Sequence, residues 1–175
     1  MKGRRRMTDF MQAVEIVLAN EGGLEQDAND AGGTTNFGIS LRFLRSIRPE
    51  AVESDIIDMT KPEAIAIYQK YFWEIAPYDK IINQTVCNYI FDTAVDCGAG
   101  NAIKISQRAC CALYGDSSIS CDGILGTKSL DDINHAGKLL LPPLKSERAN
   151  YYRSVAEKNP ADDRFLQGWL NRAYR

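Results

Sequence analysis

A carboxylate inside an apolar helical stripe is the feature that most constrains this chain. Phe10, Val14 and Val17 are spaced at i, i+4 and i+7, which predicts an amphipathic helix. Glu21 follows at i+11, which at about 100° per residue returns it to within about 20° of Phe10. The pair Gly22–Gly23 then supplies the left-handed exit that commonly ends a helix. The sequence therefore predicts a glutamate in the apolar stripe of a helix, at its end.

Glu21 has the surroundings of a carboxyl group that keeps its proton. Partial burial and the negative end of the helix dipole both disfavour ionisation, so both raise the pKa of Glu21. A raised pKa suits a general acid, which must carry a proton near neutral pH. The alternative, from helix phase alone, is a surface glutamate that happens to end a helix.

The segment after the glycines is rich in glycine and short polar residues from position 27 to position 40. This composition predicts a tight loop or a small irregular hairpin that folds polar groups back over the end of the helix. Cleavage of a glycosidic bond needs a protonated carboxyl group and a second carboxylate facing it. Asp30, nine residues after Glu21, is the candidate second carboxylate, and Asp27 is the reserve.

The same segment begins like a calcium-binding loop. Asp27, Asn29 and Gly32 occupy the first, third and sixth positions of such a loop. The fifth position is Ala31, however, and the twelfth, which requires a bidentate glutamate, is Gly38. We therefore expect no metal at this loop.

Several motifs in order resemble one family. Glu-Gly-Gly at 21–23, followed by Asp-x-x-Asp-x-Gly-Gly-x-Thr-Asn-x-Gly-Ile at 27–39, resembles glycoside hydrolase family 108, the muramidases common among phage-type endolysins and prophage-encoded proteins. Four later segments are also similar to that family: 67–73, 91–98, 122–126 and 165–172. The resemblance implies a mainly α, lysozyme-like helical fold with a small irregular β-hairpin or loop at the active site.

The resemblance also assigns roles to residues. The glutamate of Glu-Gly-Gly is the catalytic acid of the family, and here it is Glu21. Wider phage lysozymes combine that acid with an aspartate nine residues later, here Asp30, and with a threonine beyond it. Thr34 and Thr35 both fall slightly short of the threonine's usual distance, so either remains a candidate. With Asp27 and Asn36 of the same segment, they form the expected substrate-binding set.

Aromatic residues from 68 to 73 are candidates for stacking on sugar rings. Most of them are expected in the core because of their helical spacing, and one of Tyr71 and Trp73 is expected to reach the cleft. Asp92 and Asp96, at i and i+4, form either a solvated helix face or a wall of the substrate groove. Trp169 is expected to pack into the core and hold the end of the chain.

Local signals predict helices in the rest of the chain. Ser40 is a candidate cap, Thr60 and Glu63 form a capping box, and Gly98 and Gly115 end the two helices that follow. Further helices are expected after Thr127 and from 142 to about 155. We divide the chain into a lysozyme-like muramidase catalytic part, 7–90, and a peptidoglycan-binding-like helical part, 91–175, packed into one body.

The composition limits the partners. A chain of 175 residues, 45% hydrophobic, can bury one good core, and a net charge of −2 gives no sign of nucleic-acid or membrane-surface binding. The basic N-terminus precedes an amphipathic helix and not an apolar signal segment, and no later stretch is apolar enough to span a membrane. We expect synthesis in the cytoplasm without a signal peptide and action on the cell wall, in the periplasm, after release. The phage-type resemblance implies a holin for that release.

The cysteines leave their pairing open. The five cysteines are an odd number without metal-ligand spacing, and with His135 as the single histidine we expect no zinc cluster. Cys110 and Cys111 are adjacent in a helical pattern, so their side chains diverge. The simplest state is reduced, with either of these two able to pair with Cys121 after export. No cofactor is expected.

The sequence thus predicts a peptidoglycan hydrolase that cleaves the β-1,4 bond between N-acetylmuramic acid and N-acetylglucosamine. Glu21 would protonate the glycosidic oxygen, and Asp30 would activate water or stabilise the cationic transition state. Two alternatives stay open. One is a non-hydrolytic peptidoglycan-binding, secretion-associated protein, and the other is a lytic transglycosylase or chitinase of the same fold.

Overall fold

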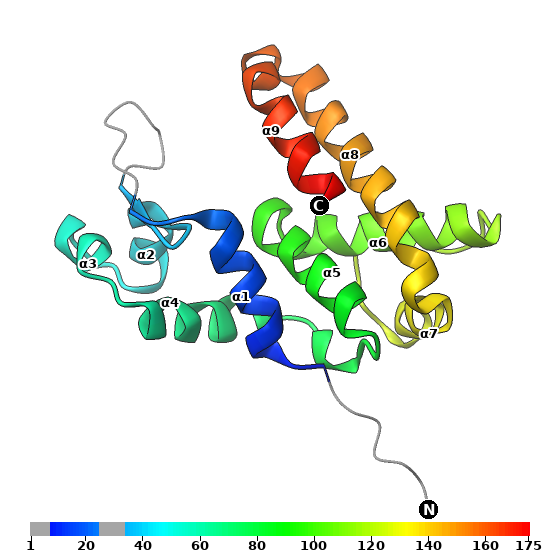
Figure 1. Cartoon of the computed structure of the whole chain (residues 1–175), viewed down its shortest axis with the longest axis horizontal. Coiled ribbons are helices and arrows are strands. Elements are labelled where there is room, and N and C mark those ends of the chain that lie inside the picture. The colour runs from blue at the N-terminus through cyan, green and yellow to red at the C-terminus, as the bar shows by residue number, and fades with distance from the viewer. Residues whose placement is uncertain (1–7, 25–33) are drawn as a thin grey trace, which may run out of the picture.

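Helices make up most of the computed structural model, which describes residues 8–24 and 34–175 (Figure 1). The described elements are, in chain order, α1 (Phe10–Glu21), β1 (Thr35–Asn36), β2 (Ile39–Ser40), α2 (Leu41–Ile47), α3 (Glu53–Ile57), α4 (Lys61–Tyr68), a π-helical turn (Gln69–Trp73), a 3-10 turn (Tyr78–Lys80), α5 (Gln84–Cys97), α6 (Ala99–Tyr114), α7 (Thr127–Ala136), a 3-10 turn (Gly137–Leu140), α8 (Leu141–Lys158), a 3-10 turn (Pro160–Asp162) and α9 (Asp163–Tyr174). The expected mainly α, lysozyme-like fold with a small hairpin is confirmed.

Side-chain caps and glycines set several of the helix ends. Asp9 caps α1 by accepting a hydrogen bond from the backbone N–H of Met11, and Ser40 caps α2 in the same way. Thr60 and Glu63 form the predicted capping box of α4. At the other end, α6 stops at Gly115, which has a left-handed conformation (φ 62°). The ends at Ser40, Thr60 and Gly115 were predicted from the sequence, because each depends on residues within one helical turn.

The elements form two lobes joined by α1 and α5. In Figure 1 the hairpin and helices α2 to α4 lie on one side of α1, and α6 and α7 lie on the other side. Helices α8 and α9 pack against each other as an antiparallel pair, and α9 carries the C-terminal end of the chain back toward α5. The last turn of α9 thereby comes close to the end of α1.

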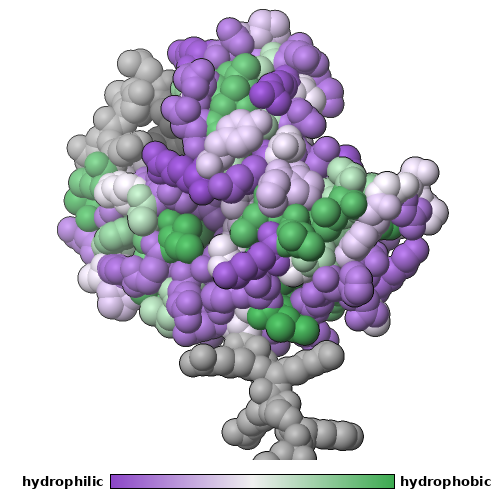
Figure 2. Space-filling model, turned by 45° about the vertical axis from the view of Figure 1, so that its right-hand side comes forward, coloured by the Kyte–Doolittle hydropathy of each residue, from purple (hydrophilic) through white to green (hydrophobic). Residues whose placement is uncertain are grey.

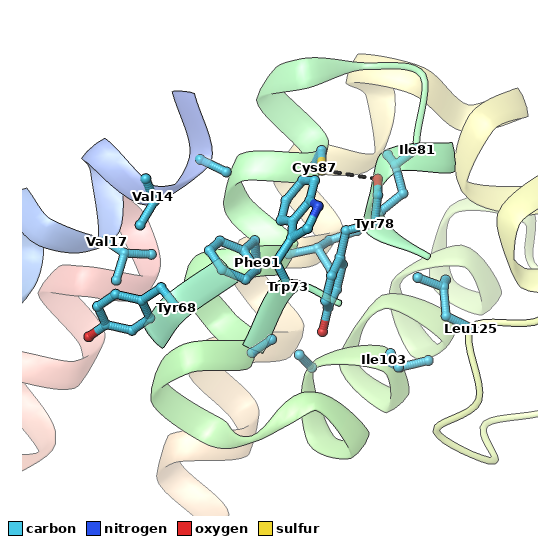
Figure 3. Close-up of a cluster of buried hydrophobic side chains, with 14 of the residues drawn as sticks. Val14, Val17, Tyr68, Trp73, Tyr78, Ile81, Cys87, Phe91, Ile103 and Leu125 are labelled. Carbon is cyan, nitrogen blue, oxygen red and sulfur yellow. Dashed lines mark hydrogen bonds between the residues drawn. The ribbon is translucent and has the colours of Figure 1, made fainter. Parts of the chain in front are cut away.

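An aromatic cluster lies where the lobes meet (Figure 3). The ring centroid of Trp73 is 5.0 Å from that of Phe91, 5.4 Å from that of Phe10 and 5.6 Å from that of Tyr78. These aromatic rings meet at tilted or edge-on angles, which suit their charge distributions. The cluster packs the end of the α4 segment against α1 and α5.

The helix that starts at Lys61 changes its pitch before it ends. The backbone N–H of Glu74 bonds to the carbonyl oxygen of Gln69, five residues earlier, as in a π-helix. The wider turn places Trp73, five residues after Tyr68, on the buried side with it. Trp73 is only 9% exposed, so its side chain is a core group, whereas Tyr71 stays half-buried beside Phe43.

One face of the molecule is drawn by the hydropathy of its residues in Figure 2. The face in Figure 2 is largely hydrophilic, with apolar residues in small patches. Within the described part of the chain, none of the helices is both long and apolar enough to cross a membrane.

Replacement of Trp73 by alanine should destabilise the protein strongly. The lost ring leaves a cavity among three aromatic partners, and such substitutions cost about 3–5 kcal/mol of unfolding free energy. Tyr71→Ala is the matched control, with an expected cost under about 1.5 kcal/mol because its ring is only partly buried. Urea denaturation followed by circular dichroism measures both values. Equal costs for the two variants would contradict this account of the core.

Candidate active site

Glu21 is the last residue of α1, where the helix meets the hairpin. The helix buries Ala13, Val14, Val17 and Leu18, and Gly22 ends it with a positive φ of 79°. The side chain of Glu21 is 20% exposed. The carboxyl group therefore lies at the edge of the core with limited access to water.

The hairpin turn covers one side of Glu21. Phe37 and Gly38 connect β1 to β2, and both have positive φ angles, 52° and 76°, as a two-residue type I′ turn requires. A Cβ atom at position 38 would lie 2.6 Å from Cγ and 2.8 Å from Oε2 of Glu21, which leaves room for glycine alone. The hydroxyl of Tyr68 donates to the carbonyl oxygen of Phe37 over 2.9 Å and holds the turn in place.

Arg172 covers another side of Glu21. Its Nη2 lies 2.6 Å from Oε1 of Glu21, and it also lies 2.7 Å from Oδ1 of Asp92. The two partners in the first pair are 151 positions apart in the chain. Helix α9 thus supplies the counter-ion for a carboxyl group on α1.

Arg172 belongs to a buried ion network. Asp92 on α5 accepts from Arg172 and also from Nη1 of Arg148, on α8, over 2.7 Å. Arg148 is fully buried and reaches Asp96 as well, and the hydroxyl of Tyr152 donates to Asp96. The expectation of a solvated helix face is wrong for Asp92, because its side chain is only 6% exposed and serves two guanidinium groups.

The charges of the network do not balance when every group is ionised. Three carboxyl groups, of Glu21, Asp92 and Asp96, share two guanidinium groups, of Arg148 and Arg172. One proton on a carboxyl group would make the cluster neutral. The group that takes this proton is decided by burial and by the number of donors each carboxyl group meets.

Glu21 is the carboxyl group best placed to hold the proton. Burial raises its pKa, the charge and hydrogen bond of Arg172 oppose the shift, and the carboxylates of Asp96 and Asp92 add to it, so that the net direction is upward. Burial alone would also raise the pKa of Asp92. There, hydrogen bonds and charge from Arg172, together with Arg148 and the amide of Asn20, reverse the direction and lower it.

Two other polar residues predicted for the site, Thr34 and Asn36, form hydrogen bonds within the protein. The hydroxyl of Thr34 donates to Glu53, and the amide of Asn36 donates to the carbonyl oxygen of Ile56 over 3.0 Å. Both residues are buried, so they tie the hairpin to α3. Thr35 pairs with Ser40 in the hairpin and remains half-buried.

The structure brings some of the predicted site residues together and separates others. Glu21 lies beneath the turn that β1 and β2 form, whereas Trp73 is in the core and its predicted contact with sugar is not possible without unfolding the cluster. Tyr71 remains the aromatic residue of the pair with exposed surface. Asp27 and Asp30 lie outside the described residues.

The sequence did not lead us to predict that Arg148 and Arg172 belong to the site. Leu144, Arg148 and Tyr152 recur at i, i+4 and i+8, so Arg148 occupies the buried stripe of α8 in the way that Glu21 does on α1. Arg172 precedes the buried Ala173 on α9. A charged residue within an apolar stripe was the available signal, and two carboxylates at Asp92 and Asp96 were the matching opposite charges.

A mainly α body with a partly buried glutamate beneath a small hairpin defines the lysozyme-like class of proteins. Residues 14–98 match the family model described as glycosyl hydrolase 108, and residues 101–174 match the one described as predicted peptidoglycan domain. Residues 14–98 are therefore a glycosyl hydrolase 108 part, and residues 101–174 are this peptidoglycan domain.

One solved structure extends this relationship over nearly the whole chain. The structure of SagA from Brucella abortus is similar with a TM-score of 0.76 at 25% sequence identity, over 95% of this chain and 90% of that chain. No curated protein matches the chain. The two matched domains support a glycoside hydrolase that acts on the peptidoglycan of the cell wall.

The negatively and positively charged groups of the ion network lie in different matched domains. The carboxyl groups of Glu21, Asp92 and Asp96 lie in the glycosyl hydrolase part, whereas the guanidinium groups of Arg148 and Arg172 lie in the peptidoglycan domain. The second domain thus completes the surroundings of the candidate acid.

Replacement of Arg172 by methionine should raise the pKa of Glu21 further. Arg172 is the group that opposes the effect of burial, so its loss leaves desolvation and the neighbouring carboxylates unopposed. Carboxyl ¹³C NMR titration measures the shift, with the Glu21 signal identified by its absence in Glu21→Gln. Lys61→Met removes a surface ion pair with Glu15 and should leave the pKa of Glu21 unchanged. A lower pKa in the Arg172 variant would refute this electrostatic account.

Proposed function

We propose that this protein is an N-acetylmuramidase that cleaves the β-1,4 bond between N-acetylmuramic acid and N-acetylglucosamine, with Glu21 as the general acid. The observation that carries the proposal is the carboxyl group of Glu21, partly buried between the Phe37–Gly38 turn and Arg172, with a raised pKa. A general acid in this position protonates the oxygen of the leaving sugar.

The two oxygens of Glu21 take different roles. Oε1 accepts a hydrogen bond from Arg172, which has no site to accept a proton in return. The proton is therefore carried by Oε2, the oxygen beside Gly38. After it is donated, Arg172 stabilises the carboxylate that is left, and it limits the rise in pKa so that the proton can leave.

The second carboxyl group is proposed to be that of Asp30, with Asp27 in reserve. Support comes from sequence spacing and from the family resemblance, since both residues lie outside the described part of the chain. This group would activate water or stabilise the oxocarbenium-like transition state. The distance between the two carboxyl groups distinguishes inverting from retaining hydrolysis.

We also propose the domain roles and the site of action. Residues 7–90 would form the catalytic part and residues 91–175 the part that binds the glycan strand. The ion pair of Arg172 with Glu21 crosses this boundary, and it supports a single working unit. Use as an endolysin, with holin-dependent release to the periplasm, belongs to this proposal and rests on the resemblance.

Replacement of Glu21 by glutamine should reduce cleavage of purified peptidoglycan by roughly 100- to 10,000-fold, because an amide has no acidic proton to donate. Mass spectrometry of the soluble products should find reducing muropeptides that end in N-acetylmuramic acid for the wild type. Glu15→Gln is the matched control, since Glu15 lies on the same helix, is half exposed and pairs with Lys61. The wild-type rate should also fall as the pH rises above the pKa of Glu21.

The products separate the proposal from its alternatives. Full activity of Glu21→Gln would remove Glu21 from the mechanism. Products with 1,6-anhydro ends would identify a lytic transglycosylase. Intact binding to sacculi with no product from the wild type would identify a non-hydrolytic, peptidoglycan-binding protein.

Replacement of Asp30 by asparagine should abolish most hydrolysis while binding to sacculi is kept, because the second carboxylate acts in the chemical step. Asp27→Asn is the matched variant within the same segment. Product release and sacculus binding are measured in parallel for both. Full activity of Asp30→Asn combined with loss in Asp27→Asn would transfer the role to Asp27, and loss in neither would favour a mechanism with Glu21 alone.

A further inference from the structure

Two thiols lie close together near the end of α6. Sγ of Cys111, near the end of α6, lies 3.9 Å from Sγ of Cys121, in the loop that leads to α7. All five cysteines are free thiols in this structure, and both members of this pair are half-buried. A disulfide needs the two sulfur atoms at about 2 Å, so the pair is within the reach of small side-chain rotations.

The loop is already docked on the same face of α6. Gln107, one turn before Cys111, is buried, and its side-chain amide donates to Oδ1 of Asp122 over 2.8 Å. Its side-chain oxygen accepts from the backbone N–H of Gly123 over 2.9 Å. Because Cys121 immediately precedes Asp122, this anchor holds its thiol opposite Cys111 without help from a covalent bond.

The remaining thiols are poorly placed to compete. Cys110 and Cys87 are buried in the core, and burial raises the pKa of each thiol to about 12. The thiol of Cys97 also has its pKa raised to about 12 by burial. The pKa of Cys111 is raised as well, by burial and then by Cys121, so exchange at this pair will be faster in mildly alkaline solution.

We propose that Cys111 and Cys121 are a modification site and form an intramolecular disulfide when the protein meets an oxidising compartment. The oxidant is a disulfide, such as oxidised glutathione. One cysteine thiolate attacks it, which forms a mixed disulfide and releases one glutathione thiolate. The second cysteine then attacks the mixed disulfide and releases the other. Two electrons pass from the cysteine pair to the oxidant, and the two thiol protons pass to the released thiolates.

The bond would close the loop over residues 112–120 and restrict the unfolded chain. It would raise Tm by on the order of 5–10 °C. The network of Glu21 and Arg172 contains none of these residues, so this inference does not depend on the proposed function.

The test is a thiol count after incubation of the full chain with oxidised glutathione at about pH 8. Acid quenching, denaturation and alkylation are followed by intact mass spectrometry. The wild type should lose two of its five reactive thiols, and Cys110→Ser, the adjacent control, should also lose two. Cys111→Ser and Cys121→Ser should lose no pair, and neither should show the rise in Tm on oxidation.

A second measurement, peptide mapping, uses the wild-type chain and needs no variant. Chymotryptic cleavage after Tyr114 separates Cys110 and Cys111 from Cys121, so the bridge would hold two peptides together until reduction. Five alkylated thiols, or stable glutathione adducts in place of a bridge, would overturn the inference. A bridge that survives in Cys111→Ser and disappears in Cys110→Ser would overturn it too, because it would assign Cys110 to the pair.

Discussion

Asp92 between Arg148 and Arg172 is the interaction on which the rest of the structure depends. Removing three charged groups from water is costly, so they are stable only when each has a partner in good geometry. That requirement brings α5, α8 and α9 together with Asp92 at the centre, 2.7 Å from each guanidinium group. Once α9 is fixed in this way, Arg172 also reaches Glu21 on α1. The ion pairs of Asp92 with Arg148 and Arg172 therefore help to fix the surroundings of the Glu21 carboxyl group.

The same network gives its two central carboxyl groups opposite pKa shifts, and so opposite effects on stability. Folding lowers the pKa of Asp92, so its contribution to stability is present above the pKa of the unfolded chain and is lost as the pH falls through the folded pKa. Folding raises the pKa of Glu21, so its contribution is present below the unfolded pKa and is lost as the pH rises through the folded pKa. Near neutral pH, the raised pKa of Glu21 therefore lowers the stability of the folded protein, whereas the lowered pKa of Asp92 increases it.

Local features of the fold could be predicted from the sequence, and long-range ones could not. The cap at Ser40, the capping box at Thr60 and the glycine end at Gly115 each depend on one turn of chain. The helix phase of Glu21 is equally local, and the structure places its side chain at the edge of the core as that phase indicated.

The contact between Glu21 and Arg172 crosses 151 positions, and no period in the sequence encodes it. The burial of Trp73 depends on one π-helical turn, which propensity does not reveal. The hydroxyl of Thr34 and the amide of Asn36 were expected at substrate, but the nearby α3 offered partners for both.

The distribution of charge between the two matched domains gives a physical reason for their packing together. If the peptidoglycan domain were only a binding attachment, the glycosyl hydrolase part would satisfy its own buried groups. Instead, within the described residues, the network leaves three carboxyl groups on that part and both of their guanidinium partners on the other. Separated from α8 and α9, Asp92 would have to be hydrated or protonated, and Glu21 would lose the group that limits its pKa. The direction of the pKa shift of Glu21 therefore depends on residues of both matched domains.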